Sequence, residues 1–191
     1  MNCLIVIAHH NPASYNHAIL QTVKDELTAS GHQVRVRDLY QMNFNPNHIP
    51  IPGTVPTDIA IEQEHIRWAE KMIFIYPTWW TNMPAILKGY IDRVFTYGFA
   101  YQFVDNKLVG QFADKQIFLF TTTNNREEDY RSSGMLASMS QVVDEGVFRF
   151  CGVRHLTHTY LSHIHGITDA ERSALLDEVK ECIRRELLVI T

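Results

Sequence analysis

The chain has 191 residues, of which 46% are hydrophobic, 11% aromatic and 20% charged. A chain of this length suits one folded domain and is short for two, so we expect a single domain over residues 1–191. The formal net charge of −4 excludes the strongly basic surface that a nucleic-acid binder needs. The composition also excludes the disordered, fibrous and low-complexity classes.

The cysteines and the first apolar segment indicate a cellular compartment. Cys3, Cys151 and Cys182 are odd in number and show no CxxC spacing, so we expect reduced core thiols rather than a disulfide framework or a thiolate metal site. The apolar run from Leu4 to Ala8 has only the length of a strand and lacks a preceding basic region. It predicts neither a signal peptide nor a membrane span, so we expect a cytoplasmic protein.

Short buried strands alternate with amphipathic helices along the chain. Strands are predicted at residues 3–8, 33–39, 72–76, 116–120 and 153–161. Helices are predicted between a Ser14 cap and Gly31, and at residues 58–70, 84–95, 135–150 and 169–188, with a long surface loop at residues 41–57. Parallel strands need crossover connections, so the pattern predicts a doubly wound α/β fold: a five-stranded parallel sheet with helices on both faces.

The loops after the first, third and fourth predicted strands are the expected ligand site, because doubly wound sheets bind ligands where the strand order reverses. The first of these loops brings Ser14 and Asn16 to the start of a helix, where unpaired amides and the helix dipole attract anions. A phosphate suits this position; alternatively, Ser14 only caps the helix. Neither GxGxxG nor GxxxxGK[ST] occurs in the sequence, which excludes a Rossmann dinucleotide fingerprint and a P-loop.

Two adjacent tryptophans, Trp79 and Trp80, directly follow the third predicted strand. Exposing this much aromatic surface costs free energy unless something flat, or a partner chain, covers it. The pair therefore predicts a platform for a planar ring system. The alternative is that both indoles pack into the core.

Three segments carry a resemblance to a known family: His9 with Ser14-Tyr15-Asn16, the run from Pro77 to Phe95, and Gly98-Phe99-Ala100-Tyr101. Together they resemble the NAD(P)H:quinone oxidoreductase family of flavodoxin-like flavoproteins, which includes diaphorases, general stress proteins and potassium-efflux-associated reductases. The resemblance spans essentially the whole chain. It implies a flavodoxin-like fold and an enzyme that oxidises NAD(P)H.

The resemblance also implies a bound flavin. The chain lacks an obvious adenine-binding extension, which favours FMN, with FAD as the alternative. The residues implied at the phosphate and ribityl end are His9, Ser14, Tyr15, Asn16 and Ala18. Those implied around the ring system are Pro77, Thr78, Trp79, Trp80 and Thr81. Those implied at the pyrimidine edge are Thr122, Thr123, Asn124, Asn125 and Tyr130.

The implied chemistry is a ping-pong reaction, in which NAD(P)H passes a hydride to flavin N5 and a quinone or similar acceptor then takes two electrons in the same slot. Tyr130 is the expected catalytic hydrogen-bond donor near flavin N1 and O2. The resemblance further implies a homodimer whose sites lie at the interface. Tyr101 and Phe103 would then line the substrate slot over the partner's flavin.

Two departures from the family pattern occur, at three positions. Asn124-Asn125 stands where the family commonly has two glycines, and Leu136 stands where it often has a histidine. Asparagine tolerates left-handed backbone geometry, so we expect the loop to keep its course while the added side chains narrow the nicotinamide pocket. Without the histidine, Tyr130 is the remaining donor near N1.

The sequence also bears on three other interpretations: a metal site, an electron carrier and a regulatory subunit. Four histidines crowd into one segment, His155, His158, His163 and His165, but they lack helical ligand spacing, so we expect no metal site. A flavodoxin-type electron carrier usually has a strongly acidic surface, whereas the net charge of this chain is only −4, which disfavours that function. A flavin-binding regulatory subunit of a membrane transporter stays open, since its docking surface would have no recognisable motif.

Overall fold

Five short strands, three of them almost continuously apolar, form one parallel sheet in the computed structural model, which describes residues 1–47 and 54–188. The strands are β1 (Asn2–Ile7), β2 (Gln33–Asp38), β3 (Lys71–Pro77), β6 (Gln116–Thr122) and β7 (His155–Leu161). Their order in the sheet is β2-β1-β3-β6-β7, and every pairing is parallel. The predicted doubly wound α/β fold is confirmed.

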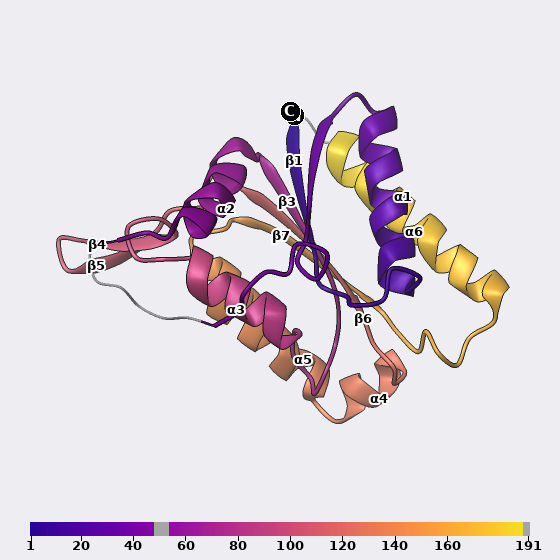
Figure 1. The fold of residues 1–191 in the computed structure, drawn as a ribbon. Helices are drawn as coiled ribbons and strands as arrows, with labels where there is room; N and C mark the ends of the chain where they lie inside the picture. The colour runs from indigo at the N-terminus through magenta and orange to yellow at the C-terminus, as the bar shows by residue number, and fades with distance from the viewer. Residues whose placement is uncertain (48–53, 189–191) are drawn as a thin grey trace.

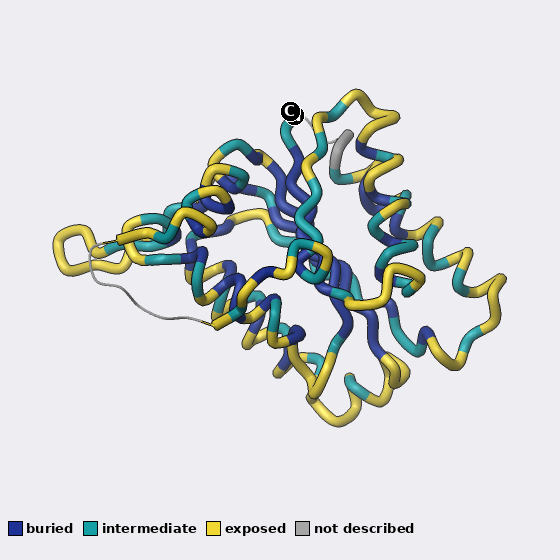
Figure 2. Tube along the Cα trace, in the orientation of Figure 1, coloured by how far each residue is buried: buried dark blue, intermediate teal, exposed yellow. Residues whose placement is uncertain are grey.

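Side chains alternate between the two faces of the sheet, and each face buries its own apolar cluster. In β1, Ile5 and Ile7 pack under α1 (Tyr15–Ala29) and α6 (Asp169–Leu188). Leu4 and Val6 belong to the opposite cluster. That face is covered by α2 (Thr57–Trp68), α3 (Ala85–Val94), α5 (Met135–Ser140) and the π-helix η1 (Gln141–Arg149). Figure 1 shows the two helical layers on either side of the strands, and Figure 2 shows that the strands between them are buried.

Local sequence signals set the helix ends as predicted. Ser14 caps α1, because its hydroxyl oxygen accepts a hydrogen bond from the His17 amide. Gly31 follows α1 with a left-handed φ of 78°, which a glycine adopts without a Cβ clash. Pro84 directly precedes α3. The edge position expected for the second predicted strand is confirmed as well, since β2 lies at one end of the sheet.

Three elements differ from the sequence prediction. The segment expected to be merely extended around Tyr101 and Phe103 is an antiparallel hairpin of β4 (Tyr101–Val104) and β5 (Lys107–Gly110). Its turn places Asp105 and Asn106 at φ values of 51° and 59°, the left-handed geometry of a tight hairpin turn. A short helix, α4 (Glu127–Ser132), also went unpredicted. The helix expected over residues 135–150 divides into α5 and η1.

Two further expectations concern the loop and the cysteines. Residues 48–53 of the predicted surface loop lie outside the described residues. Cys3, Cys151 and Cys182 are buried and unpaired, as expected for core thiols. Burial raises the pKa of Cys3 to about 11 and that of Cys151 to about 12. No helix in the described part of the chain is long and apolar enough to span a membrane.

Candidate functional site

A cavity of about 500 Å³ opens beyond the carboxyl ends of β1, β3 and β6, beside the start of α1. This is the place where the strand order reverses, and its volume lies in the range of small-molecule sites. The lining residues are His9, Asn11, Ala13, Ser14, Tyr15, Asn16, Ala18, Pro77, Trp79, Thr122, Ile164, His165 and Arg172. Eight of the residues predicted from the sequence therefore line one cavity.

The start of α1 supplies backbone donors to this cavity. The amides of His17 and Ala18 are bonded to the Ser14 carbonyl oxygen. The amides of Tyr15 and Asn16 come before these bonds in the helix, and no acceptor among the described residues is bonded to them. Two free amides at a helix N-terminus form a ready site for an anion.

His9 adds a neutral donor to the same cavity. Its Nδ1 accepts a hydrogen bond from the Asn11 amide at 3.1 Å, so in neutral His9 the ring hydrogen lies on Nε2. Burial, followed by the neighbouring charge of His10, lowers the pKa of His9. His9 therefore offers a single N–H near neutral pH rather than a positive charge.

Asn16 joins the first loop to the end of β6. Its side chain is buried, and Nδ2 donates to Thr122 Oγ1 at 3.0 Å. Its Oδ1 is also buried and has no hydrogen-bond partner among the described residues. A buried acceptor without a donor is costly, so this oxygen suits a ligand that brings a hydroxyl group.

Arg172, which was not predicted from the sequence, contributes a positively charged side chain to the cavity. Its guanidinium group donates to the Ile164 and Ile167 carbonyl oxygens and pairs with Asp169. Tyr15 donates its phenol hydrogen to the Arg172 carbonyl oxygen at 2.6 Å, and burial raises the pKa of Tyr15 to about 12. Asn11, Ala13, Ile164 and His165 were missed as well. No local pattern marks Arg172, because α6 is brought beside α1 only by the completed sheet.

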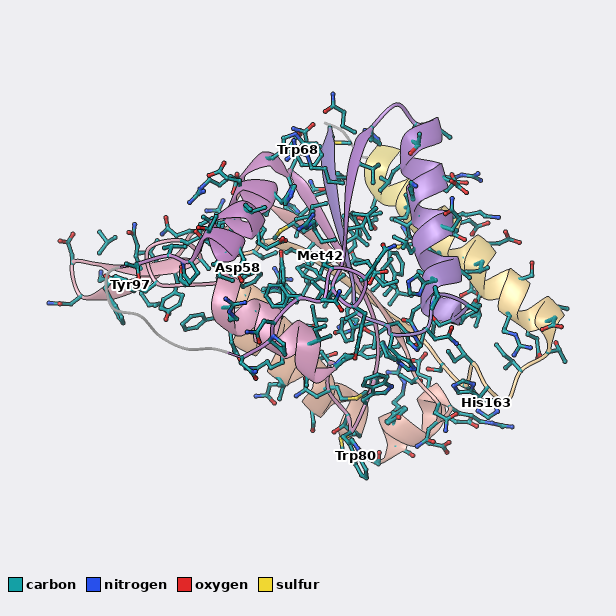
Figure 3. The ribbon with its side chains drawn as sticks, viewed as in Figure 1. Met42, Asp58, Trp68, Trp80, Tyr97 and His163 are labelled. Atoms are coloured by element: carbon teal, nitrogen blue, oxygen red, sulfur yellow. The ribbon has the colours of Figure 1, made fainter. Side chains whose placement is uncertain are left out.

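The loop after β3 forms a tight turn that presents the tryptophans. Trp79 and Asn82 exchange backbone hydrogen bonds at 2.9 and 3.1 Å, and between them Trp80 and Thr81 have φ values of 51° and 60°. The Trp80 side chain points into solvent at the edge of the molecule, 99% exposed, and Trp79 is 39% exposed (Figure 3). The alternative in which both indoles pack into the core is wrong.

A buried polar network lies behind this turn. His158 Nδ1 lies 2.7 Å from Asp144 Oδ1, and His158 Nε2 lies 2.9 Å from Thr121 Oγ1. Tyr76 is hydrogen-bonded to Thr121, and burial raises the pKa of Tyr76 well above its ordinary value. A small cavity between this network and the turn is lined by Thr78 and Thr81 among others. The network and the turn therefore line opposite sides of one small cavity.

The loop after β6 does not place its two asparagines in the left-handed geometry that the sequence allowed. Asn124 and Asn125 are not among the residues with positive φ, whereas His163 of the neighbouring loop has a φ of 59°. The His163 amide donates to the Asn125 carbonyl oxygen at 3.2 Å, and its Nδ1 lies 3.0 Å from the Asn124 carbonyl oxygen. Asn124 and Asn125 therefore do not need the left-handed geometry that a glycine pair would allow, and the neighbouring His163 is hydrogen-bonded to both of their carbonyl oxygens. No group of three or more metal-ligand side chains gathers anywhere in residues 1–47 and 54–188.

The remaining predicted residues lie around or away from the cavity. Thr123 is buried beneath the loop, and Tyr130 is half-buried on α4. Tyr101 and Phe103 lie on the β4–β5 hairpin, which projects from the opposite end of the molecule. Figure 3 shows Tyr97, at the base of this hairpin, far from Trp80. Within one chain, the hairpin and the cavity do not meet.

The chemistry of the cavity fits the flavin that the sequence resemblance implies. The free amides of α1 and the Arg172 guanidinium suit a phosphate. The unpartnered Asn16 oxygen suits a hydroxyl of a polyol chain. Trp79 and Pro77 give the far wall an apolar surface for a flat ring. The cavity thus brings together groups that suit the phosphate, the polyol chain and the ring of one flavin.

Comparison with known proteins agrees with the fold. Residues 1–183 match the model of a protein family described by its flavodoxin-like fold. A Haemophilus influenzae protein named as an NAD(P)H oxidoreductase is 36% identical over 184 residues, covering 93% of this chain and 91% of that one. NAD(P)H dehydrogenase (quinone) 1 of Rattus norvegicus is 33% identical over 179 residues, covering 80% of this chain and 65% of that one. The solved NAD(P)H:quinone oxidoreductase from Methanothermobacter marburgensis is 29% identical, with a TM-score of 0.88, covering 96% of this chain and 98% of that one.

The strained turn yields a stability prediction. Thr81 is β-branched and its backbone is left-handed, with a φ of 60°, a conformation that destabilises the folded state by about 1–3 kcal/mol. A glycine there would avoid this strain but would cost about 0.5–1 kcal/mol, because it gives the unfolded chain more conformational entropy. Thr81→Gly should therefore raise the free energy of unfolding by about 1 kcal/mol in a urea titration. Thr78→Gly, at a position without positive φ, is the matched control and should lower it by a similar amount. Equal losses in both variants would show that the turn is not strained.

Proposed function

We propose that this oxidoreductase, which belongs to the family with the flavodoxin-like fold, is an NAD(P)H:quinone oxidoreductase that holds FMN in the cavity beside α1. The observation that carries the proposal is the meeting of an anion site with an aromatic wall where the strand order reverses. The names of the rat and Methanothermobacter relatives support the donor and the quinone acceptor.

Each end of the cavity has its own binding role. The Tyr15 and Asn16 amides and the Arg172 guanidinium hold the phosphate, and His9 Nε2–H contributes a neutral donor. Asn16 Oδ1 accepts from the ribityl chain. Pro77, Thr78 and the Trp79–Asn82 turn bound the ring system. FAD is the alternative cofactor, and its adenosine would need binding surface beyond this cavity.

The bound flavin supplies the redox chemistry, which is acceptance of a hydride from NAD(P)H and its delivery to the quinone. The residues of the chain position the reactants and exclude water. Trp80, exposed on the turn, offers an aromatic face for a planar substrate. Tyr130 offers a phenol hydrogen to the pyrimidine edge. Since one slot serves both substrates in turn, we expect ping-pong kinetics.

We further propose a homodimer that completes this slot. The β4–β5 hairpin exposes Phe103 at 59%, Val104 at 45% and Leu108 at 42%, an apolar surface that favours burial against a partner. The hairpin lies far from the cavity of its own chain. In a two-fold dimer, Tyr101 and Phe103 would cover the substrate slot of the other protomer.

The proposal is tested by isolating the protein and identifying its cofactor. We expect a yellow protein with a flavin absorbance spectrum, release of FMN identified by mass, and NAD(P)H oxidation that depends on an added quinone. Steady-state rates should give parallel double-reciprocal lines. A protein that stays colourless in micromolar FMN or FAD would overturn the proposal. Release of FAD would show that the cofactor is FAD and would leave the proposed activity unchanged.

Tyr130→Phe should slow the reduction of the bound flavin by NAD(P)H while leaving flavin affinity nearly unchanged. Losing one preorganised donor costs about 10²- to 10³-fold at a dry site. No residue of α4 is fully buried, so water partly replaces the phenol and we expect a loss of about tenfold. Anaerobic stopped-flow absorbance measures this rate, and a flavin titration of the same variant is the control. A rate equal to the wild type would make Tyr130 structural.

A further inference from the structure

A chain of hydrogen bonds connects Ser14, at the start of α1, to the end of β2. Ser14 Oγ lies 3.0 Å from His17 Nδ1, and His17 Nε2 lies 3.1 Å from Asp38 Oδ2. The side chains of His17 and Asp38 are only 14% and 15% exposed. Both line a second cavity of about 490 Å³, which adjoins the first one through His9.

The surroundings of Asp38 settle which ring nitrogen of His17 carries a hydrogen. Asp38 Oδ1 accepts from the Tyr40 and Gln41 amides, each at 3.1 Å, so only Oδ2 faces His17. A carboxylate has no hydrogen to donate, so His17 Nε2 must be the donor. In neutral His17, Nδ1 is then a bare acceptor, and the Ser14 hydroxyl hydrogen points to it.

This arrangement conflicts with phosphate binding by Ser14. A phosphate dianion only accepts hydrogen bonds, and neutral His17 already holds the hydroxyl hydrogen of Ser14. A protonated His17 reverses the bond, because Nδ1–H then donates to Ser14 Oγ. That oxygen then accepts from the His17 amide, at 3.3 Å, and from Nδ1. The hydroxyl hydrogen is free for the phosphate.

We propose that His17 is the positioning residue that directs the Ser14 hydroxyl hydrogen, and that binding of the FMN phosphate takes up one proton from solvent at His17. The inference rests on the proposed function, because it needs the phosphate at the start of α1. It adds a residue that contacts Ser14 rather than the cofactor, and it makes cofactor affinity depend on pH.

The pH dependence of FMN affinity involves the titratable groups around His17. Asp38 approaches His17 from β2, while Tyr40 and Leu20 line the same cavity. The His9 ring lies 6.4 Å away, with His10 stacked against it. Burial lowers the pKa of His9. The bound state holds more protons, so FMN affinity rises as pH falls and the gain is lost at high pH.

Calorimetric titration of the flavin-free protein with FMN, in two buffers of different ionisation enthalpy, counts the protons taken up. Above pH 7 the phosphate is mostly a dianion, since its second pKa is about 6, so it contributes little. We expect net uptake at pH 7.5 and a loss of FMN affinity of about tenfold between pH 7 and 8.5, the scale of one charge-assisted hydrogen bond. Riboflavin, which lacks the phosphate, should bind without uptake.

Two variants and one control assign the proton. His17→Gln cannot titrate and should bind FMN without proton uptake. In Asp38→Asn, the Tyr40 and Gln41 amides still need an oxygen acceptor, so the asparagine Oδ1 takes that position and its NH₂ group faces His17 Nε2. Neutral His17 then carries its hydrogen on Nδ1, and uptake should again vanish. His10→Gln, in the same crevice but stacked on His9, should keep the wild-type uptake.

The outcomes separate the two proposals. FMN binding without proton uptake by the wild type, or with unchanged uptake in His17→Gln, overturns the role of His17 and leaves the proposed function intact. Failure of FMN, FAD and riboflavin alike to bind overturns both proposals.

Discussion

β1 and β3 are adjacent parallel strands, paired from Cys3 opposite Lys71 to Ile7 opposite Ile75. The connections that follow these two strands turn toward opposite faces of the sheet. After β1 the chain enters α1 on one face, and after the turn that follows β3 it enters α3 on the other. Two loops that diverge from adjacent strands leave a crevice between them. The start of α1 and Trp79 line one cavity because of this pairing.

Carboxylate–histidine pairs direct hydroxyl hydrogens on both sides of that crevice. Asp38 acts through His17 on Ser14, and Asp144 acts through His158 on Thr121. Each carboxylate fixes the tautomer of its histidine, which in turn decides whether the hydroxyl donates or accepts. The first pair lies beside the anion end of the cavity, and the second lines a small cavity next to the turn that follows β3. Hydrogen-bond direction is thus set from outside the residues that line the cavity.

The sequence predicted what depends on local patterns. Buried strands, the Ser14 cap and the Gly31 helix end follow from periodicity and from residue type at one position, and the resemblance supplied most lining residues. Arg172 could not be found this way, since only the folded sheet brings α6 beside the first loop. The β4–β5 hairpin was missed because its turn, Asp105-Asn106, lacks the glycine that usually marks one. Left-handed geometry was considered for the asparagine pair on residue type alone, but the backbone angles of Asn124 and Asn125 depend on the folded loop and are not left-handed.

The central claim is that the start of α1 holds the phosphate of the cofactor, and amide hydrogen exchange tests it residue by residue. The Tyr15 and Asn16 amides have no acceptor among the described residues, so they should exchange fast in the flavin-free protein. We predict that FMN slows both amides, whereas riboflavin leaves them fast while changing the signals of the Trp79–Asn82 turn. Equal effects of the two flavins on Tyr15 and Asn16, or none, would contradict the account.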